Sequence, residues 1–301
     1  MDCVKQALSS FQNTIKLTEN EPMRRRTTFR IGGPARYFAE LTPDAPVGEI
    51  LAALRETGTP VTVIGRGSNL LVSDEGIPGV VLCTLGYNRV AVDGAHIRAQ
   101  AGATLAQIAA AALAHGLTGF EFAAGIPGSL GGAVFMNAGA YDGAIADAVT
   151  RSDYAQPDGT EHVLTGAAHE FGYRESVYKR HPERLILSAD LALHPGDPNA
   201  IRARMDDLAC RRRDKQPLEY ASAGSTFKRP EGYFAGKLIE DCNLKGFRIG
   251  DAQVSEKHAG FLINRGHATA DDMRRLIETV QSRVLAAFGI ELQCEVRFLG
   301  F

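Results

Sequence analysis

The segment GRGSN at residues 65–69 has the residue types of a loop that binds a phosphate group. Its glycines let the backbone turn sharply, so that successive N–H groups, with Ser68 and Asn69, can face one anion. A Rossmann loop needs a third glycine opening a helix, whereas the following NLLVSDEGIPGVV predicts a strand, a turn and a strand. The segment therefore predicts either a pyrophosphate-binding loop outside a Rossmann fold or a tight hairpin turn without a ligand.

The segment AGIPGSLGGAVFMNAGAY at residues 124–141 is more unusual. Five glycines and a proline alternate with small apolar residues, which makes it too apolar for a surface loop and too rich in glycine for a helix or strand. Backbone N–H groups in such a segment need partners, and a flat polar ring system with its phosphates would supply them. A buried, kinked loop without a ligand is the alternative.

Four further segments carry charged or hydroxyl side chains that could act on a substrate. They are GYRESVYK (172–179), RRRDKQP (211–217), AGSTFKRP (223–230) and EVR (295–297). Each also has an ordinary explanation: a solvated charge cluster, cations at a helix C-terminus, a capping serine, or an exposed ion pair. The residue types alone leave both kinds of explanation open for each segment.

Hydrophobic periodicity predicts the elements that must position these segments. Helices are predicted over 44–57, 105–115, 199–212, part of 232–242, and 270–288. Strands are predicted over 61–64, 70–72, 80–83, 185–193 and 259–264, with a last strand over 292–300 and hairpins over 89–100 and 148–165. The order predicts a mixed α+β protein and not a βαβ array.

Three local features refine this prediction. A turn is predicted at Gly76, Pro78 and Gly79, and the strand 61–64 is expected to be buried. PGDPN at 195–199 is the best candidate for a linker between domains. The long helix should begin after Thr269, with Asp272 in its first turn. Its apolar stripe should consist of Met273, Leu276, Ile277, Val280, Val284 and Leu285.

Composition excludes several classes of protein. The 301 residues correspond to about two domains, and a net charge of −2 argues against binding nucleic acid or an anionic membrane by bulk charge. No apolar run approaches a membrane span, and the N-terminus lacks the apolar centre of a signal peptide, so we expect a cytoplasmic protein. Five scattered cysteines and eight histidines show no metal-ligand spacing, and Cys294 is expected in the core. Nineteen of the 32 glycines lie within 30–145, which predicts backbone folded closely around a ligand.

The order of the motifs along the chain is specific where each motif alone is not. The blocks are FRIGGPA (29–35), GRGSNLLV (65–72), IPGSLGGAVFMNAGAY (126–141), GYRESVYK (172–179), AGSTFKRP (223–230), AGKLIEDCNLKGFRIGDAQVS (235–255), HAGFLIN (258–264) and EVRFLG (295–300). Through them, residues 24–300 resemble the UDP-N-acetylenolpyruvoylglucosamine reductases, flavoenzymes that make UDP-N-acetylmuramate for bacterial peptidoglycan. The resemblance implies an α+β, vanillyl-alcohol-oxidase-type (PCMH-type) FAD-binding fold.

The resemblance also implies a division of the chain and a set of site residues. FAD-binding subdomains are expected at 1–86 and 87–195, and a UDP-sugar domain at 196–301, whose C-terminal strand contributes to the active site. The implied catalytic residues are Arg174, Ser225 and Glu295, with no metal. The implied FAD-binding residues are Gly65, Arg66, Gly67, Ser68, Asn69, Leu70, Gly125, Ile126, Pro127, Gly128, Ser129, Gly131, Gly132, Asn137, Gly139 and Ala140. The implied substrate-binding residues are Tyr141, Tyr173, Lys215, Lys228 and Arg297.

The implied reaction reduces the enolpyruvyl ether of UDP-N-acetylglucosamine enolpyruvate to a lactyl ether. NADPH gives a hydride to FAD, whose N5 passes it to C3 of the substrate, and Arg174 stabilises the charge that spreads into the carboxylate. Ser225 then gives a proton to C2. Two roles stay open for Glu295: orienting a water or the carboxylate, or helping to supply the proton. We expect this sugar nucleotide and NADPH as the partners, and a monomer.

Some residues depart from the family pattern. A long insertion with a substrate-closing tyrosine, found in one branch after the strand that matches 185–193, is absent here, so the chain resembles the shorter branch. Arg229 stands where the family often has Asn, and Asp142–Gly143 follow Tyr141 where Gly-Gly or Gly-Glu is common. The alternatives are an FAD-dependent oxidase of the same fold, although the flavin loops show no His or Cys attachment motif, and a non-catalytic flavin- or UDP-sugar-binding protein.

Overall fold

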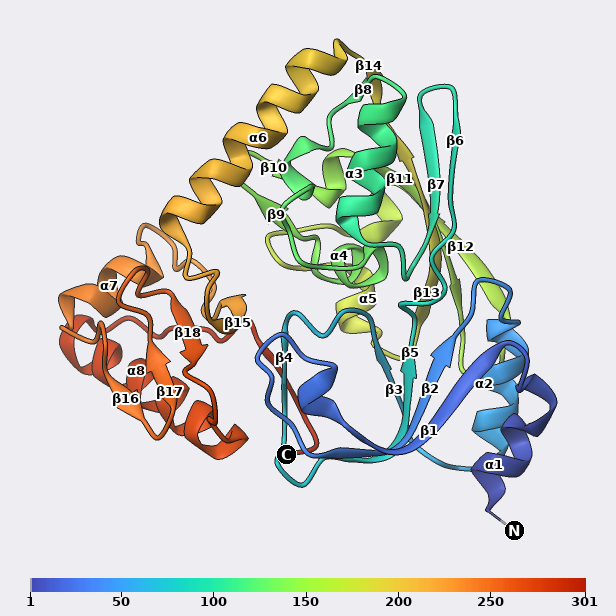
Figure 1. Ribbon diagram of the computed structural model, residues 1–301, viewed down its shortest axis with the longest axis horizontal. Coiled ribbons are helices and arrows are strands. Elements are labelled where there is room, and N and C mark those ends of the chain that lie inside the picture. Colours follow the sequence, from blue (N-terminus) through green and yellow to red (C-terminus); the bar gives the residue numbers. More distant parts are fainter. Residues whose placement is uncertain (1) are drawn as a thin grey trace. The chain divides into compact units, whose positions relative to one another are not determined.

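The computed structural model describes residues 2–301, which form two compact units. The first consists of the chain up to Glu19, Tyr37–Arg66 and Gly79–Cys210; the second consists of Asn20–Arg36, Gly67–Pro78 and Arg211–Phe301. The chain thus passes between the units several times. Both contain helices and strands that do not alternate as βαβ repeats, so the α+β prediction is confirmed (Figure 1).

The first unit contains a five-stranded antiparallel sheet with the order β12-β11-β13-β7-β6. The predicted hairpins are confirmed as β6–β7 and β11–β12. Two helices, α3 and α4, contact β7 of this sheet, and Figure 1 shows both on the same side of it. The bounds are β6 Val90–Asp93, β7 His96–Gln100, β11 Val149–Ala155, β12 Glu161–Thr165, β13 Leu185–Ala192, α3 Leu105–Ala114, α4 Leu130–Met136 and α5 Val177–Arg180.

Helix α4 lies where the glycine content predicted irregular backbone, and that prediction is wrong for these residues. A Cβ on Gly131 would lie 2.9 Å from the Cβ of Ala101, so close packing requires a glycine at this position of the helix. The N–H of Gly131 also donates to the Ala101 carbonyl at 2.8 Å. Tertiary packing therefore overrides the low helix propensity of glycine.

A four-stranded sheet has the order β1-β2-β5-β3, with β3 and β5 parallel. The turn predicted at Pro78 and Gly79 is wrong, because both lie inside β5, where a Cβ on Gly79 would lie 2.2 Å from the Pro60 carbonyl oxygen. Strand β3 is half-buried rather than buried, with only Ile64 fully inside. The bounds are α1 Cys3–Leu8, β1 Ile15–Pro22, β2 Pro34–Leu41, α2 Val47–Glu56, β3 Val61–Ile64 and β5 Ile77–Cys83.

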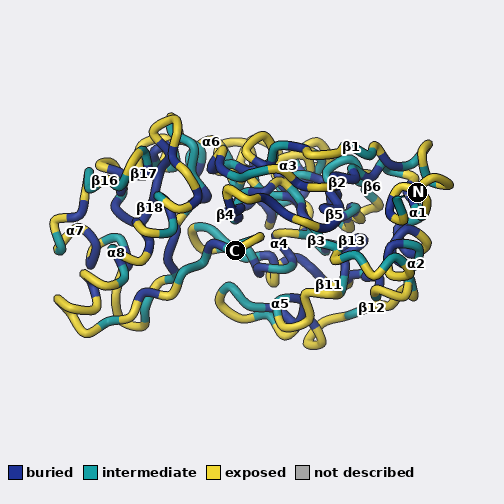
Figure 2. Tube along the Cα trace, turned by 90° about the horizontal axis from the view of Figure 1, so that it is seen from below, coloured by how far each residue is buried: buried dark blue, intermediate teal, exposed yellow. Residues whose placement is uncertain are grey.

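The second unit is built on a four-stranded sheet with the order β15-β18-β17-β16, and α8 contacts β16 and β17. Strands β17 and β18 are buried throughout, as Figure 2 shows. The predicted capping box of Thr269 and Asp272 is confirmed, but Leu285 is 50% exposed and does not belong to the buried stripe. The bounds are β15 Ala221–Ser225, α7 Ala235–Asp241, β16 Arg248–Ile249, β17 Ala252–Val254, β18 Phe261–Asn264 and α8 Ala270–Phe288.

The last predicted strand is shorter than expected. Only β19, Arg297–Leu299, is regular, and it pairs in parallel with β4, Leu70–Val72. The residues before it alternate as predicted, with Leu292 and Val296 buried, whereas Cys294 is half-buried against the core rather than inside it.

Helix α6, Pro198–Lys215, occupies the region after the predicted linker. Pro195 of that segment belongs to β14, His194–Pro195, which pairs with β8, Leu117–Thr118, and Pro198 opens the helix. The boundary between the two units falls inside α6, after Cys210. Only Gly196 and Asp197 of PGDPN therefore lie outside helices and strands, and Pro198 is compatible with the first position of a helix.

Candidate active site

The two glycine-rich segments meet at Gly65 and Ser129. Gly65 follows β3, Ser129 directly precedes α4, and a Cβ on Gly65 would lie 2.0 Å from the Ser129 Oγ. Within the described part of the chain, the buried Ser129 hydroxyl has no hydrogen-bond partner. A buried polar group without a partner is costly unless something outside the chain satisfies it. A polar ligand between these two loops would do so, and this fits the cofactor that the sequence implies.

The segment before α4 is fixed to the start of α3. The carbonyl of Gly128 accepts from Leu105 N at 3.1 Å, and Leu130 N donates to Ala103 O at 2.8 Å. Gly125, Pro127 and Gly132 stay exposed beside this anchored backbone. The loop is therefore held in place by its own hydrogen bonds and still presents an open surface.

The other end of the second glycine-rich segment supports the Arg174 turn, the four residues 172–175 that Gly172 and Glu175 close by bonding each other. Asn137 ends α4 in the left-handed conformation (φ 41°), and its Nδ2 donates to the Gly172 carbonyl at 2.9 Å while its Oδ1 accepts from Ala146 N at 3.0 Å. Arg174 itself donates through Nη2 to the Gly139 carbonyl at 2.9 Å. Asn137, Gly139 and Arg174, which the sequence assigned to two different roles, therefore lie together.

Ser225 and Glu295 lie on neighbouring backbone segments of the second unit. Glu295 N donates to Thr226 O at 2.8 Å, and Lys228 N donates to Gln293 O at 2.9 Å, on either side of an antiparallel bridge between Phe227 and Cys294. Ser225 is exposed at the end of β15, next to Gly224, whose φ is +77°. The segments that carry the predicted proton donor and the predicted carboxylate are therefore paired.

The first glycine loop joins the same assembly through Asn69. Its Nδ2 donates to the Glu295 carbonyl at 3.1 Å, and its own carbonyl accepts from Arg297 N at 3.0 Å. Gly67 has a φ of +65°, and a Cβ there would lie 2.1 Å from the Arg26 carbonyl oxygen, so this position requires glycine. The side chain of Asn69 thus positions the C-terminal segment.

The predicted substrate-binding residues lie in both units. In the first, Tyr141 is 42% exposed and donates to the Leu208 carbonyl at 3.1 Å, and Tyr173 is 56% exposed with the Arg174 guanidinium 5.2 Å from its ring centre. In the second, Lys215 is the exposed last residue of α6, and Lys228 and Arg297 are half-buried. Burial lowers the pKa of the Arg297 guanidinium below its usual value.

Sequence reasoning missed two groups of residues that support this site. One is Thr226, which is fully buried and makes three bonds to two segments: its N–H donates to Gly260 O (2.9 Å), its Oγ1 accepts from Leu262 N (3.3 Å) and its carbonyl accepts from Glu295 N. The second is the buried cluster Ser152, His169 and Tyr178 beside the Arg174 turn. No local pattern marks either group, because their partners are distant in sequence.

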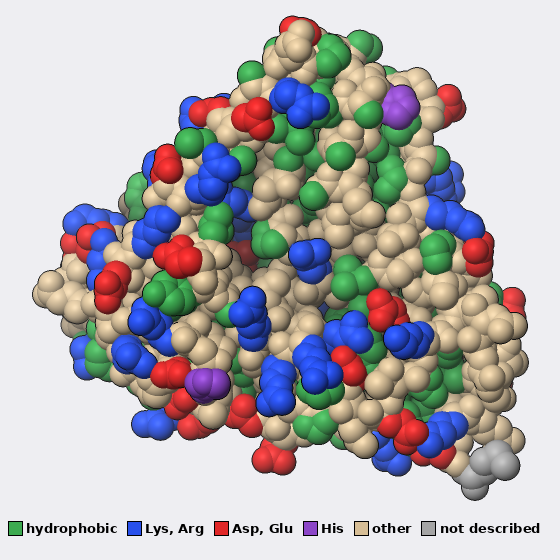
Figure 3. Space-filling view, viewed as in Figure 1, with side chains coloured by type: hydrophobic (Ala, Val, Ile, Leu, Met, Phe, Trp, Pro, Cys, Tyr) green, Lys and Arg blue, Asp and Glu red, His purple; other side chains and the backbone are tan. Residues whose placement is uncertain are grey.

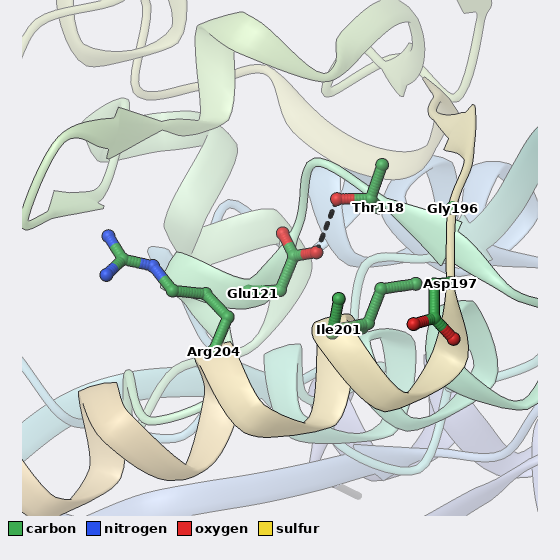
Figure 4. Close-up of a pocket in the computed structure, with 7 residues that line it drawn as sticks. Thr118, Glu121, Gly196, Asp197, Ile201 and Arg204 are labelled. Atoms are coloured by element: carbon green, nitrogen blue, oxygen red, sulfur yellow. Dashed lines mark hydrogen bonds between the residues drawn. The ribbon is translucent and has the colours of Figure 1, made fainter.

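A separate depression of about 330 Å³ lies in the first unit, at the N-terminal end of α6 (Figure 4). The Thr118 hydroxyl donates to Glu121 at 2.6 Å within it, and Asp197, Ile201 and Arg204 complete much of its wall. None of the predicted site residues lines it. Figure 3 shows acidic and basic side chains interspersed on the visible face of the molecule.

Among residues 2–301, no helix has both the length and the apolar character needed to cross a membrane. Within the same residues, no group of three or more His, Cys, Asp or Glu side chains could hold a metal ion.

Comparisons with known proteins address the family directly. Residues 35–165 match a family described as "FAD binding domain", and residues 216–299 match one described as "UDP-N-acetylenolpyruvoylglucosamine reductase, C-terminal domain". The chain is 48% identical to the UDP-N-acetylenolpyruvoylglucosamine reductase of Caldanaerobacter subterraneus, over 95% of this chain and 94% of that protein. It is 47% identical to the Clostridium perfringens enzyme of the same name, over 97% of this chain and 96% of that protein.

Solved structures agree with this result. The crystal structure of UDP-N-acetylenolpyruvylglucosamine reductase from Thermus caldophilus matches with a TM-score of 0.79 and 33% identity, covering 95% of this chain and 98% of that one. The FAD-binding fold, the FAD cofactor and the oxidoreductase class expected from the motifs are confirmed. Since relatives this similar span nearly the whole of both chains, the protein belongs to the UDP-N-acetylenolpyruvoylglucosamine reductase family.

Proposed function

We propose that this protein reduces UDP-N-acetylglucosamine enolpyruvate to UDP-N-acetylmuramate, with NADPH as the source of reducing equivalents. One observation of the site carries the proposal most strongly: the 2.8 Å bond from Glu295 N to Thr226 O pairs the segments that hold the proposed proton donor and the proposed carboxylate. The names of the relatives support the same substrate class.

The glycine-rich loops are the proposed FAD site. Bound FAD, once reduced, supplies a hydride to the vinyl carbon of the substrate. Gly65–Leu70 and Gly125–Ala140 would hold it, and the buried Ser129 hydroxyl next to Gly65 has no hydrogen-bond partner among the described residues. The proposed FAD site therefore rests on a buried hydroxyl that could form its missing hydrogen bond with a bound ligand.

Arg174 is the proposed stabiliser of negative charge. Addition of hydride to C3 leaves charge at C2, which spreads into the neighbouring carboxylate. A guanidinium is cationic at any physiological pH and can bind both carboxylate oxygens, so it suits this role. Its bond to the Gly139 carbonyl orients the guanidinium in advance.

Ser225 is the proposed proton donor to C2, and Glu295 its proposed partner. A serine hydroxyl is a weak acid, but a carbanion is a strong base, so transfer is efficient when the hydroxyl is positioned. Glu295, held by Asn69 and Thr226, is proposed to orient a water or the substrate carboxylate, or to help supply the proton.

The remaining proposed contacts recognise the sugar nucleotide. Lys215, Lys228 and Arg297 supply positive charge for the diphosphate and carboxylate, and the exposed rings of Tyr141 and Tyr173 supply flat surfaces. Because Arg297 is half-buried, water screens its charge less than that of an exposed arginine.

The proposal includes the organisation and setting of the protein. FAD-binding parts at 1–86 and 87–195 and a UDP-sugar part at 196–301 are proposed. Three apolar cores lie mostly within these parts, but the core built mainly from 1–86 also contains Leu185, and the core built mainly from 196–301 also contains Phe29 and Leu71. A cytoplasmic monomer is also proposed.

The test separates the two halves of the reaction. In Ser225→Ala, reduction of bound FAD by NADPH should stay within about twofold of wild type, and reoxidation by the sugar nucleotide should slow by about 10²- to 10⁴-fold. Ser222→Ala, on the same strand, is the matched control and should leave both steps unchanged. If reoxidation stays fast in Ser225→Ala, Ser225 is not the acid. If wild-type protein binds FAD but the sugar nucleotide never reoxidises it, the proposed substrate is wrong.

A further inference from the structure

Arg174 occupies a backbone conformation that arginine adopts only under constraint. Gly172 N donates to Glu175 O at 3.0 Å and Glu175 N to Gly172 O at 3.2 Å, which closes a turn with Tyr173 and Arg174 at its centre. Arg174 is the second of these two central residues and has a φ of +57°. This region favours glycine or asparagine, and another residue there carries a cost of roughly 1–3 kcal/mol. The surrounding structure must therefore hold the turn.

Two side chains bind the carbonyls of this turn. Asn137 Nδ2 donates to the Gly172 carbonyl at 2.9 Å, and Lys179 Nζ donates to the Arg174 carbonyl at 3.0 Å. The same ammonium lies 2.7 Å from the Glu175 carboxylate. The cation of Lys179 thus joins the backbone of Arg174 to the next side chain along the turn.

Lys179 projects from a rigid base. It lies on α5, whose N-cap residue Ser176 is fully buried and donates to the Phe135 carbonyl at 2.7 Å. Tyr178, the second residue of α5, is also fully buried, and its hydroxyl lies 2.6 Å from Ser152 Oγ. Because α5 is fixed on both sides, the ammonium of Lys179 has a defined position from which to hold the turn.

We propose that Lys179 is a positioning residue for the reaction: its bond to the Arg174 carbonyl keeps the turn in the strained conformation that aims the Arg174 guanidinium. This inference rests on the proposed function of Arg174. The ordinary alternative is an i,i+4 ion pair between Glu175 and Lys179 at the surface, which contributes little to stability and nothing to catalysis.

Three variants separate these explanations. Lys179→Met keeps most of the unbranched side chain and removes its donor, so reoxidation of reduced FAD by the sugar nucleotide should slow by about 10- to 100-fold. Reduction by NADPH should be unchanged. Glu175→Gln removes only the ion pair and should stay within about twofold of wild type. Lys179→Arg restores a cationic donor and should recover most of the lost rate.

A double-mutant cycle tests whether Lys179 acts through Arg174. In an Arg174→Ala background, Lys179→Met should cause no further loss, since the group that it positions is already gone. Lys237→Met, which breaks the i,i+4 pair with Asp241 on α7, is the control for a lost surface cation and should leave reoxidation unchanged.

The failures can be told apart. If Arg174→Ala does not slow reoxidation, the proposed role of Arg174 is wrong. If Arg174→Ala slows it but Lys179→Met does not, or if Glu175→Gln slows it as much as Lys179→Met, only the inference about Lys179 is wrong. A further loss from Lys179→Met in the Arg174→Ala background overturns it as well, because Lys179 would then act independently of Arg174.

Discussion

Asn69 binds the backbone of Glu295 although 226 positions separate them in the sequence. Its Nδ2 donates to the Glu295 carbonyl at 3.1 Å, and its own carbonyl accepts from Arg297 N at 3.0 Å, directly before β19 pairs with β4. The loop that the sequence assigned to the cofactor therefore also holds the segment of a proposed catalytic residue. A substitution of Asn69 can remove the side-chain bond to Glu295 and leave the backbone bond to Arg297 in place.

The variant Asn69→Ala should affect both stability and the second half-reaction. Loss of one hydrogen bond should lower the free energy of unfolding by about 0.5–1.5 kcal/mol, and reoxidation by the sugar nucleotide should slow several-fold more than reduction by NADPH. The control is Asn88→Ala, which removes a comparable side-chain bond, from Nδ2 to the Leu85 carbonyl at 3.0 Å. Equal reoxidation rates in the two variants would show that Asn69 does not position Glu295.

Thr226→Val should weaken the attachment of the Ser225 segment to β18, on which the position of Ser225 beside the Glu295 segment depends. The change keeps the volume of this fully buried side chain but leaves the Leu262 N–H without its acceptor, at a cost of about 1–3 kcal/mol. Urea unfolding measures the loss, and the half-reactions show whether it reaches the site. Thr226→Ser, which keeps the hydroxyl, should restore most of the stability; if it is as unstable as Thr226→Val, the hydroxyl bond is not the cause.

Local signals predicted those parts of the fold that local energetics decide. Thr104 with Gln107 and Thr269 with Asp272 form capping boxes, so both helix starts follow from the sequence. Helix α4 was missed because its glycines are explained only by contact with Ala101. Strand β1 was missed because its burial follows no strict alternation.

The candidate site also has a part that the sequence predicted and a part that it did not. The motifs that carry Arg174, Ser225 and Glu295 were found through their order along the chain, whereas the residues that hold them were not. Thr226 acts largely through backbone bonds, and Asn69 and Lys179 donate to backbone carbonyl groups. Because every residue has a backbone carbonyl, such partners leave no pattern in the sequence. Such supports become visible only when the register of the segments is known.

Gly65→Ala should impair FAD binding. A Cβ at this position would lie 2.0 Å from Ser129 Oγ, so the Ser129 hydroxyl would have to turn out of its position between the loops or the loops would have to separate. We expect the purified variant to contain much less FAD, measured from its visible absorbance, with added FAD binding more weakly. Gly94→Asn, at a hairpin tip where a Cβ meets nothing within 4 Å, is the control. Full FAD content in Gly65→Ala would contradict a cofactor site between these loops.

The five cysteines should differ in reactivity toward a thiol reagent. Cys3 and Cys210 are exposed, whereas Cys83 is buried. Burial raises the pKa of the Cys294 thiol to about 11, against a smaller opposing effect of its bond to the Val296 carbonyl, so it stays protonated near neutral pH. Cys242 is half-buried and burial also raises the pKa of its thiol, so two thiols should react rapidly in the native protein and all five after unfolding. Loss of a rapid phase in Cys294→Ala would contradict this assignment.

His169, which is buried beside the Arg174 turn, should make the free energy of unfolding depend on pH. Its Nε2 lies 2.8 Å from Ser152 Oγ and its Nδ1 lies 3.0 Å from the Gly166 carbonyl, while the ring is fully buried. Burial lowers the pKa of His169 below its ordinary value of 6.5, against a smaller opposing effect of the Gly166 bond. Below that value the unfolded chain binds the proton more readily than the folded one, so stability is complete above pH 6.5 and falls as the pH drops toward the lowered folded-state pKa.

This dependence can be measured without interference from carboxyl groups. Urea midpoints at about pH 8 and about pH 6 bracket the upper part of the window and lie above the range where carboxylates titrate. Wild type should lose more stability between the two than His169→Gln, whose side chain cannot take up a proton. His258, whose pKa burial also lowers, contributes equally to both proteins and cancels in the comparison. If the two proteins lose the same amount, His169 either binds a proton in the folded state or is not buried as described.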